Sequence, residues 1–161
     1  MYNSSELIEL LKKKYKIEVH QHDALFTVED SRKLRGKIDG SHTKNLFLKN
    51  KKNNFFLLSC EEADKIDLKK ISKSLELGNV SFAKEEYLEK YLRIKPGSVS
   101  PFALINDKGG FVNFYLEQTL YESDFVNFHP LINTFTIKIE TNKFIEFMME
   151  NNTKIHIFSS E

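Results

Sequence analysis

The sequence contains very little cysteine, and it lacks any long apolar run. Cys60 is its one cysteine, so no disulfide can form within the chain, and a reducing compartment is favoured. No run of about 18 apolar residues occurs, so no transmembrane helix is expected. The first residues, MYNSSELIELLKKKYK, are typical of an amphipathic helix that ends in lysines, not of a signal peptide. Together these features predict a cytoplasmic protein.

The familiar catalytic signatures are also missing. The sequence has no G-x-S-x-G nucleophile elbow, no Walker phosphate loop and no G-x-G-x-x-G. Zinc sites need Cys and His clustered at set spacings, and the pair His20/His22 with one cysteine falls short of this. We therefore expect no metal and no cofactor. Cys60 lies among apolar strand residues, which favours a buried thiol over a nucleophile.

Composition and charge indicate one domain with a basic first third. The chain has 161 residues, 40% of them hydrophobic, so we assign residues 1–161 to a single domain with a sizeable core. The net charge is only +1, but residues 1–52 hold 12 Lys and Arg against 7 Asp and Glu. Clustered positive charge can bind phosphates, although a solvated lysine-rich face is the ordinary alternative. The candidate phosphate contacts are Lys12, Lys13, Lys16, Arg32, Lys33 and Arg35.

Apolar periodicity and turn residues predict helices interleaved with hairpins. Helices are expected after Asn3 or Ser4, from Thr27, and over residues 67–77, 84–93 and 141–150. Strands are expected over residues 45–49, 54–59, 102–105, 111–116, 125–128 and 134–140, the first four forming two hairpins. This order predicts a compact α+β domain in which helices flank a mixed, mostly antiparallel and partly barrel-like sheet.

Two polar segments flank these predicted strands with unusual chemistry. In residues 40–48, Lys44 and Asn45 stand at a strand start, where an ammonium can donate to a phosphate or carbonyl and an amide can donate and accept. In residues 95–102, Gly97 and Pro101 make a shaped loop that can present N–H groups to a ligand carbonyl or ribose. A polar loop before a strand and a structural turn are the respective alternatives.

A third polar segment, residues 127–134, is a proline bend between two apolar strands. His129 and Asn133 bracket this bend. A histidine there could position water or bind a hydroxyl group. A structural histidine bonded to the backbone is the alternative.

Taken together and in this order, the three segments resemble the YbaK family of aminoacyl-tRNA deacylases, which includes the editing insertion domain of bacterial prolyl-tRNA synthetase. The strings HTKNLFL (42–48), GSVSPF (97–102) and FHPLINT (128–134) are most similar to the free-standing branch that acts on alanyl-tRNA(Pro). Residues 22–29 match more loosely, because Asp23 stands where a proline-like residue is expected. Ser41 likewise stands where glycine or alanine is frequent. The resemblance covers roughly residues 20–140.

The resemblance implies a metal-free trans-editing hydrolase that cleaves the ester between tRNA(Pro) and a wrong amino acid, with alanine as the first choice. It implies mischarged tRNA(Pro) and prolyl-tRNA synthetase as partners, with no membrane and no DNA. It implies catalytic roles for Lys44, Asn45 and His129. The substrate-binding residues that it implies are His42, Thr43, Gly97, Ser98, Val99, Ser100, Pro101, Phe102 and Asn133.

Three alternatives stay open at this point. The same family could act on cysteinyl-tRNA(Pro) or another mischarged tRNA. The chain could be an inactive module that binds tRNA or a synthetase. It could also be a metal-free hydrolase of small molecules, an interpretation that the basic first third weakly disfavours.

Overall fold

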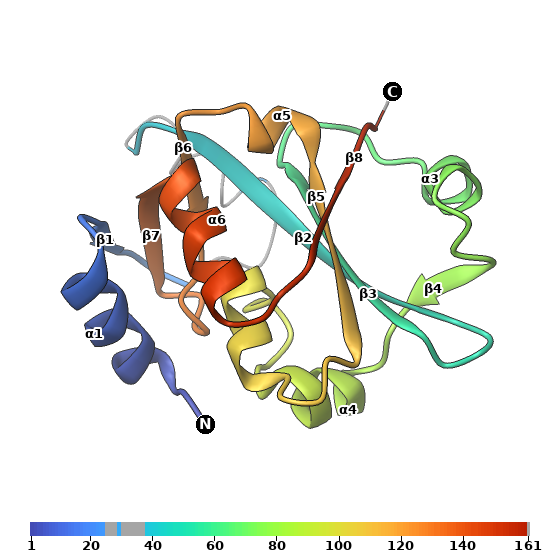
Figure 1. Ribbon diagram of the computed structural model, residues 1–161, viewed down its shortest axis with the longest axis horizontal. Helices are drawn as coiled ribbons and strands as arrows, with labels where there is room; N and C mark the ends of the chain where they lie inside the picture. The colour runs from blue at the N-terminus through green and yellow to red at the C-terminus, as the bar shows by residue number, and fades with distance from the viewer. Residues whose placement is uncertain (25–28, 30–37, 161) are drawn as a thin grey trace.

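The structure is a computed structural model, and it describes residues 1–24, 29 and 38–160. A long strand, β2 (Ser41–Asn50), runs across the molecule, and helices α1 (Ser4–Lys14) and α3 (Leu68–Ser74) lie on opposite sides of it (Figure 1). The other strands are β1 (Glu18–Gln21), β3 (Phe55–Glu61), β4 (Val80–Phe82), β5 (Val112–Glu117), β6 (Phe125–Phe128), β7 (Phe135–Glu140) and β8 (Ile155–Phe158). The other helices are α4 (Glu85–Tyr87), the π-helical turn η1 (Leu88–Leu92), the 3₁₀ helix η2 (Pro101–Asn106), α5 (Gln118–Tyr121) and α6 (Thr141–Glu150).

The strands form one mixed sheet with β2 at its centre. The strand order is β1-β7-β6-β2-β3-β5-β8, and β4 pairs with β2 off this path. The predicted mixed sheet flanked by helices is therefore confirmed. Among the described residues, four pairings are antiparallel (β1–β7, β2–β3, β2–β4 and β6–β7) and three are parallel (β2–β6, β3–β5 and β5–β8), so the antiparallel majority is small.

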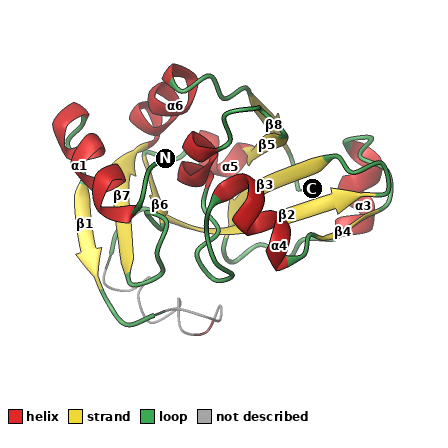
Figure 2. Ribbon diagram, turned by 90° about the horizontal axis from the view of Figure 1, so that it is seen from below, coloured by secondary structure: helices red, strands yellow, loops and turns green. Residues whose placement is uncertain are grey.

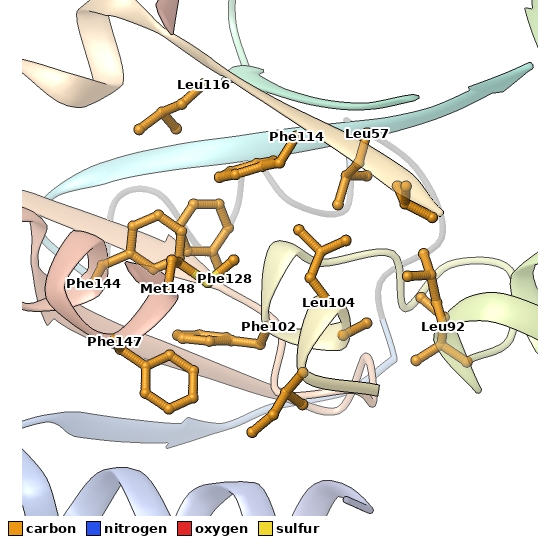
Figure 3. Packing of buried hydrophobic residues seen from close by; sticks show 14 of the residues in the cluster. Leu57, Leu92, Phe102, Leu104, Phe114, Leu116, Phe128, Phe144, Phe147 and Met148 are labelled. Atoms are coloured by element: carbon orange, nitrogen blue, oxygen red, sulfur yellow. The ribbon is translucent and has the colours of Figure 1, made fainter. Parts of the chain in front are cut away.

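The main core lies between the sheet and helices α1 and α6. Helix α1 begins at a capping box, in which the Asn3 side chain accepts from the Glu6 N–H and the Glu6 carboxylate accepts from the Asn3 N–H. Figure 2 shows α1 and α6 near each other on the β7 side, whereas α3 lies beside the β2–β3 hairpin. The aromatic centre of this core contains Phe102, which lies among Phe128 and the α6 side chains (Figure 3).

A second, smaller apolar cluster covers the opposite face of the β2–β3 hairpin. Leu48 and Leu58 belong to this cluster with Ile71 of α3, whereas Phe47 and Leu57 belong to the main core. Successive side chains on a strand point to opposite faces, so cluster membership assigns every residue of β2 and β3 to one face or the other.

The strand expected over residues 102–105 is wrong, and with it the second predicted hairpin. Residues 101–106 form η2, which Ser100 caps by accepting the Phe102 N–H at its Oγ, 3.2 Å away. Pro101 at the first helical position has no N–H to lose and a φ already suited to a helix. All six residues of η2 are buried, so the sequence offered no polar alternation to separate a strand from a helix.

Two other predicted helices are present with shifted ends. The helix expected over 84–93 is α4 followed by η1, and it ends at Arg93 with φ of 57°. The helix expected over 67–77 is α3, with Asp67 as its N-cap, and it ends at Ser74. Helix α6 has the expected bounds. The helix expected from Thr27 lies outside the described residues, and the short elements β1, β4, α5 and β8 were not predicted.

Candidate active site

Lys44 lies within β2 and not at its start, because the strand already begins at Ser41. Its partner across the hairpin is Cys60 of β3, and both share the face of the second apolar cluster. The Lys44 Nζ donates to the backbone carbonyl oxygen of Asp64, in the turn after β3. The ammonium is therefore held at the sheet surface, beside the buried Cys60 thiol, whose pKa burial raises to about 12.

Asn45 points to the opposite face of the sheet. It pairs with Ser59 of β3, and the Ser59 hydroxyl donates to the Asn45 side-chain oxygen. Strand alternation places this pair on the face of Phe47 and Leu57, next to the main core. The two neighbouring catalytic candidates therefore do not act from one surface of β2.

The start of β2 lies directly beside β6, the strand that leads to His129. His42 pairs with Asn127 in parallel register, and the Thr43 Oγ1 donates to the Asn127 carbonyl oxygen at 2.8 Å. His42 is buried, and its Nε2 bonds the Ile38 carbonyl oxygen at 2.8 Å. Since β2 and β6 run in the same direction, Lys44 and His129 each lie two residues beyond the pair of His42 and Asn127. Lys44 and His129 are two of the three predicted catalytic residues, and they thus lie in β2 and directly after the neighbouring β6.

His129 is half-buried at the end of β6, and burial lowers the pKa of its imidazole. Its Nδ1 lies 2.9 Å from the carbonyl oxygen of Phe135, which can only accept. The neutral ring therefore carries its proton on Nδ1 and leaves Nε2 as a hydrogen-bond acceptor. This nitrogen could accept from a water molecule or from the ammonium group of an amino acid.

The loop before η2 is exposed up to Gly97, and its second half packs against the main core. Ser98 and Ser100 are buried, and Gly97 has φ of 87°, a conformation that side chains rarely adopt. The Phe102 ring meets the Phe128 ring edge-to-face at a centroid distance of 5.8 Å. Because Phe128 precedes His129, this contact fixes the loop relative to the strand end that carries the histidine.

Four of the remaining predicted site residues lie in the connection between β6 and β7 and around the end of α1. Asn133 is half-buried in the connection between β6 and β7. Lys12 and Lys13 are exposed in the last turn of α1, and Lys16 is exposed just after it. Arg32, Lys33 and Arg35 lie outside the described residues.

The sequence interpretation missed two residues near the predicted site. The His22 ring lies 6.1 Å from the His129 ring, centroid to centroid, and its Nε2 bonds the Thr136 hydroxyl at 2.7 Å. Glu117 is 1% exposed, and its Oε1 accepts the backbone N–H of Glu61 at 2.8 Å. A carboxylate that closes an apolar strand was a readable signal for Glu117, whereas only tertiary structure brings His22 to His129.

Within the described ranges, no three His, Cys, Asp or Glu side chains gather in a way that could hold a metal ion. None of the helices described is both long and apolar enough to cross a membrane.

Comparison with known proteins gives a consistent result. The family model described as "Aminoacyl-tRNA editing domain" matches residues 22–147. Prolyl-tRNA editing protein ProX of Acetoanaerobium sticklandii is 33% identical over 118 residues, covering 73% of this chain and 72% of its own length. Prolyl-tRNA synthetase associated domain-containing protein 1 of Xenopus laevis is 34% identical over 133 residues, covering 80% of this chain and 79% of its own length.

The fold is also found among solved structures. One is described as a candidate trans-editing enzyme for prolyl tRNA synthetase, with a TM-score of 0.71 and 16% identity, and the match covers 100% of this chain and 99% of that one. At this level of identity the likeness shows the fold alone.

Proposed function

The chain belongs to the aminoacyl-tRNA editing domain family, and we propose that it is a trans-editing hydrolase that deacylates mischarged tRNA(Pro), with alanyl-tRNA(Pro) as its first-choice substrate. The proposal assigns residues 1–161 to one editing domain that works in the cytoplasm, where this substrate would be met. The observation that carries it is the parallel pairing of β2 with β6, which puts the strand of Lys44 beside the strand that leads to His129.

In the proposed reaction a water oxygen attacks the ester carbonyl carbon of the aminoacyl group. The bond from that carbon to the ribose 3′ oxygen then breaks, the ribose oxygen takes up a proton, and free amino acid and tRNA are released. An aminoacyl ester is already activated, so the protein needs mainly to position water and to stabilise the tetrahedral oxyanion.

The residues of the candidate site have chemistry suited to these tasks. Lys44 carries a positive charge, which can stabilise a developing oxyanion once its bond to the Asp64 carbonyl is exchanged. His129 offers its unprotonated Nε2 to the attacking water or to the substrate ammonium. The N–H groups of Val99 and Ser100, in the loop before η2, are candidates for holding the aminoacyl end.

Alanine is the first choice because of a limit on binding discrimination. A synthetase pocket built for proline cannot strongly reject a smaller amino acid, since each missing methylene costs only about 1–3 kcal/mol. A second and smaller pocket can hydrolyse alanine while it excludes proline by size. Prolyl-tRNA synthetase, which supplies the mischarged substrate, is the proposed protein partner.

Release of labelled amino acid from a panel of tRNA(Pro) species tests the proposal. We expect fast release from alanyl-tRNA(Pro) and slow release from prolyl-tRNA(Pro). A clear preference for cysteinyl-tRNA(Pro) or seryl-tRNA would leave the reaction class intact and replace the substrate.

A second candidate function is a binding module without activity. The Xenopus laevis relative is named for association with prolyl-tRNA synthetase, which is the observation that favours it. If no member of the panel is hydrolysed while tRNA or the synthetase still binds, this function replaces the first.

A further inference from the structure

The side chains of three neighbouring strands form a row on the face of the second apolar cluster. Lys44 of β2 pairs with Cys60 of β3. The parallel register of β3 with β5 ends at Ser59 and Leu116, so the next residues, Cys60 and Glu117, continue the row. An ammonium, a thiol and a carboxylate thus follow one another across the sheet, and Lys44 and Glu117 both act electrostatically on the Cys60 thiol.

Glu117 occupies the point at which the ladder between β3 and β5 stops. After Glu117 the chain turns into α5, so β5 offers no further backbone carbonyl to β3. The Glu117 Oε1 accepts the Glu61 N–H in its place, at 2.8 Å. A half-buried backbone donor without a partner would cost free energy, so this side chain completes the end of β3.

The end of β3 leads directly to the acceptor that holds Lys44. The Asp64 N–H donates to the Glu61 carbonyl oxygen at 3.1 Å, which closes a turn. The Asp64 carbonyl oxygen in turn accepts from the Lys44 Nζ. The Glu117 carboxylate, the Glu61 peptide and the Asp64 turn therefore form a continuous support beneath the ammonium.

We propose that Glu117 is a positioning residue for Lys44: its carboxylate fixes the end of β3, and the turn that follows then presents the Asp64 carbonyl oxygen to the lysine. The inference rests on the proposed function in so far as Lys44 acts on the aminoacyl ester. Glu117 is 1% exposed, so retaining a carboxylate there needs strong partners. Burial raises the pKa of this carboxyl group, and hydrogen bonding, which includes the bond from the Glu61 N–H, acts in the opposite direction, so the net shift of the pKa is downward.

The experiment compares Glu117→Ala, Glu117→Gln and Glu117→Asp in alanyl-tRNA(Pro) deacylation. Glu117→Ala should lower kcat by about ten- to a hundredfold with KM nearly unchanged, as expected when a reacting group is misplaced. Glutamine keeps an acceptor oxygen at the same reach and should retain most of kcat. Aspartate keeps the charge but is one methylene shorter, so it should lose more activity than glutamine.

A double mutant isolates the link to the lysine. Because the two residues act as one unit, Glu117→Ala should add little to the loss caused by Lys44→Ala. Independent, multiplying losses would overturn the proposal, and so would a Glu117→Ala enzyme with normal kcat. If the alanine variant fails to fold, the glutamine and aspartate variants decide, and an aspartate enzyme as active as the glutamine enzyme overturns it.

Asp107→Ala is the matched control. Its carboxylate accepts the N–H groups of Phe111 and Val112 at 3.1 and 2.8 Å, at the other end of β5. The Asp107→Ala variant should be less stable than the wild type and should keep the same kcat. An equal fall in kcat for Asp107→Ala would mean that any loosening of β5 acts on the site, which would also overturn the proposal.

A spectroscopic readout separates this inference from the proposed function. Reductive methylation with ¹³C-formaldehyde gives a ¹³C NMR signal from the methylated Lys44 Nζ, which is identified by its loss in Lys44→Ala. The chemical shift of that signal should change in Glu117→Ala and stay the same in Asp107→Ala, even if the wild type releases no amino acid from any tRNA. An unmoved signal in Glu117→Ala overturns the inference, whatever the activity.

Discussion

At the scale of single residues, Lys44 is the side chain on which the proposed chemistry depends most. Lys44→Ala should lower kcat by about 10²-fold, the size of effect seen when one oxyanion donor is lost. The fold should survive, since the side chain lies half-buried at the sheet surface and makes its bond to a turn carbonyl. Single-turnover deacylation and the melting temperature give the two measurements. A rise in KM with kcat unchanged would assign the lysine to docking instead.

Lys49→Ala on the same strand is the control for Lys44→Ala. Lys49 is also half-buried, and its Nζ lies 5.6 Å from the centre of the Tyr87 ring, away from the Asp64 turn. Its kcat should stay within a factor of about two of the wild type, since surface substitutions away from a site have small effects. A Lys44→Ala protein with native melting temperature and normal deacylation would remove Lys44 from the site.

His129 predicts a pH dependence of stability at the same scale. Burial lowers its pKa below the ordinary value of 6.5, so between the two values the unfolded chain binds a proton that the folded chain does not. The stability that His129 contributes is therefore complete above the unfolded pKa and is lost as pH falls through the folded pKa. Between pH 7.5 and 5, the free energy of unfolding measured in urea should fall more for the wild type than for His129→Gln. Parallel curves would contradict the burial argument.

At the scale of elements, α1 carries the proposed electrostatic contact with tRNA. Lys12, Lys13 and Lys16 are exposed, whereas Lys14 pairs with Glu150 of α6 at 3.0 Å. Reversing the three exposed charges should raise KM several-fold and flatten its salt dependence, because fewer phosphate counterions are released on binding. The ratio of alanyl- to prolyl-tRNA hydrolysis should not change, since phosphate contacts position the RNA without reading the amino acid.

Helix α3 provides the control for the reversals on α1. Lys69, Lys70 and Lys73 are exposed on α3, which lies on the other side of β2 from α1 (Figure 1). Reversing these three changes the net charge by the same amount as the α1 variant. If both triple variants flatten the salt dependence equally, total charge governs binding and α1 has no special part in it.

At the scale of the whole molecule, one aromatic core joins the loop 97–102 to the end of β6. Phe102 is fully buried and meets the rings of Phe128, Phe144 and Phe147 at centroid distances of 5.6–5.8 Å. Phe102→Ala should lower the free energy of unfolding by about 3–5 kcal/mol, the cost of removing a buried phenyl ring and leaving a cavity. Urea unfolding at neutral pH measures the loss.

Phe111→Ala supplies the comparison for this core. Phe111 is 59% exposed, so its ring buries little apolar area on folding. The loss of stability should be several-fold smaller than for Phe102→Ala. Equal losses would contradict the central place of the Phe102 ring in the core.

The sequence by itself determined the elements whose signals are local. Apolar spacing predicted α3 and the bounds of α6, the Asn3 cap marked the start of α1, and turn residues indicated the β2–β3 hairpin. These signals depend on neighbouring residues and hydrogen bonds within a few positions. The family resemblance was equally local, since it rested on short strings at Lys44, Gly97 and His129, and the family match confirmed it.

Only the tertiary structure decided what is paired across the chain. Residues 102–105 are helical and not a strand, and because every residue of η2 is buried, no polar alternation in the sequence distinguished the two. The parallel pairing of β2 with β6, the separation of Lys44 and Asn45 onto two faces, and the approach of Glu117 to Glu61 all join segments far apart in sequence. Long-range register depends on how whole strands bury their faces, so no local pattern in the sequence encodes it.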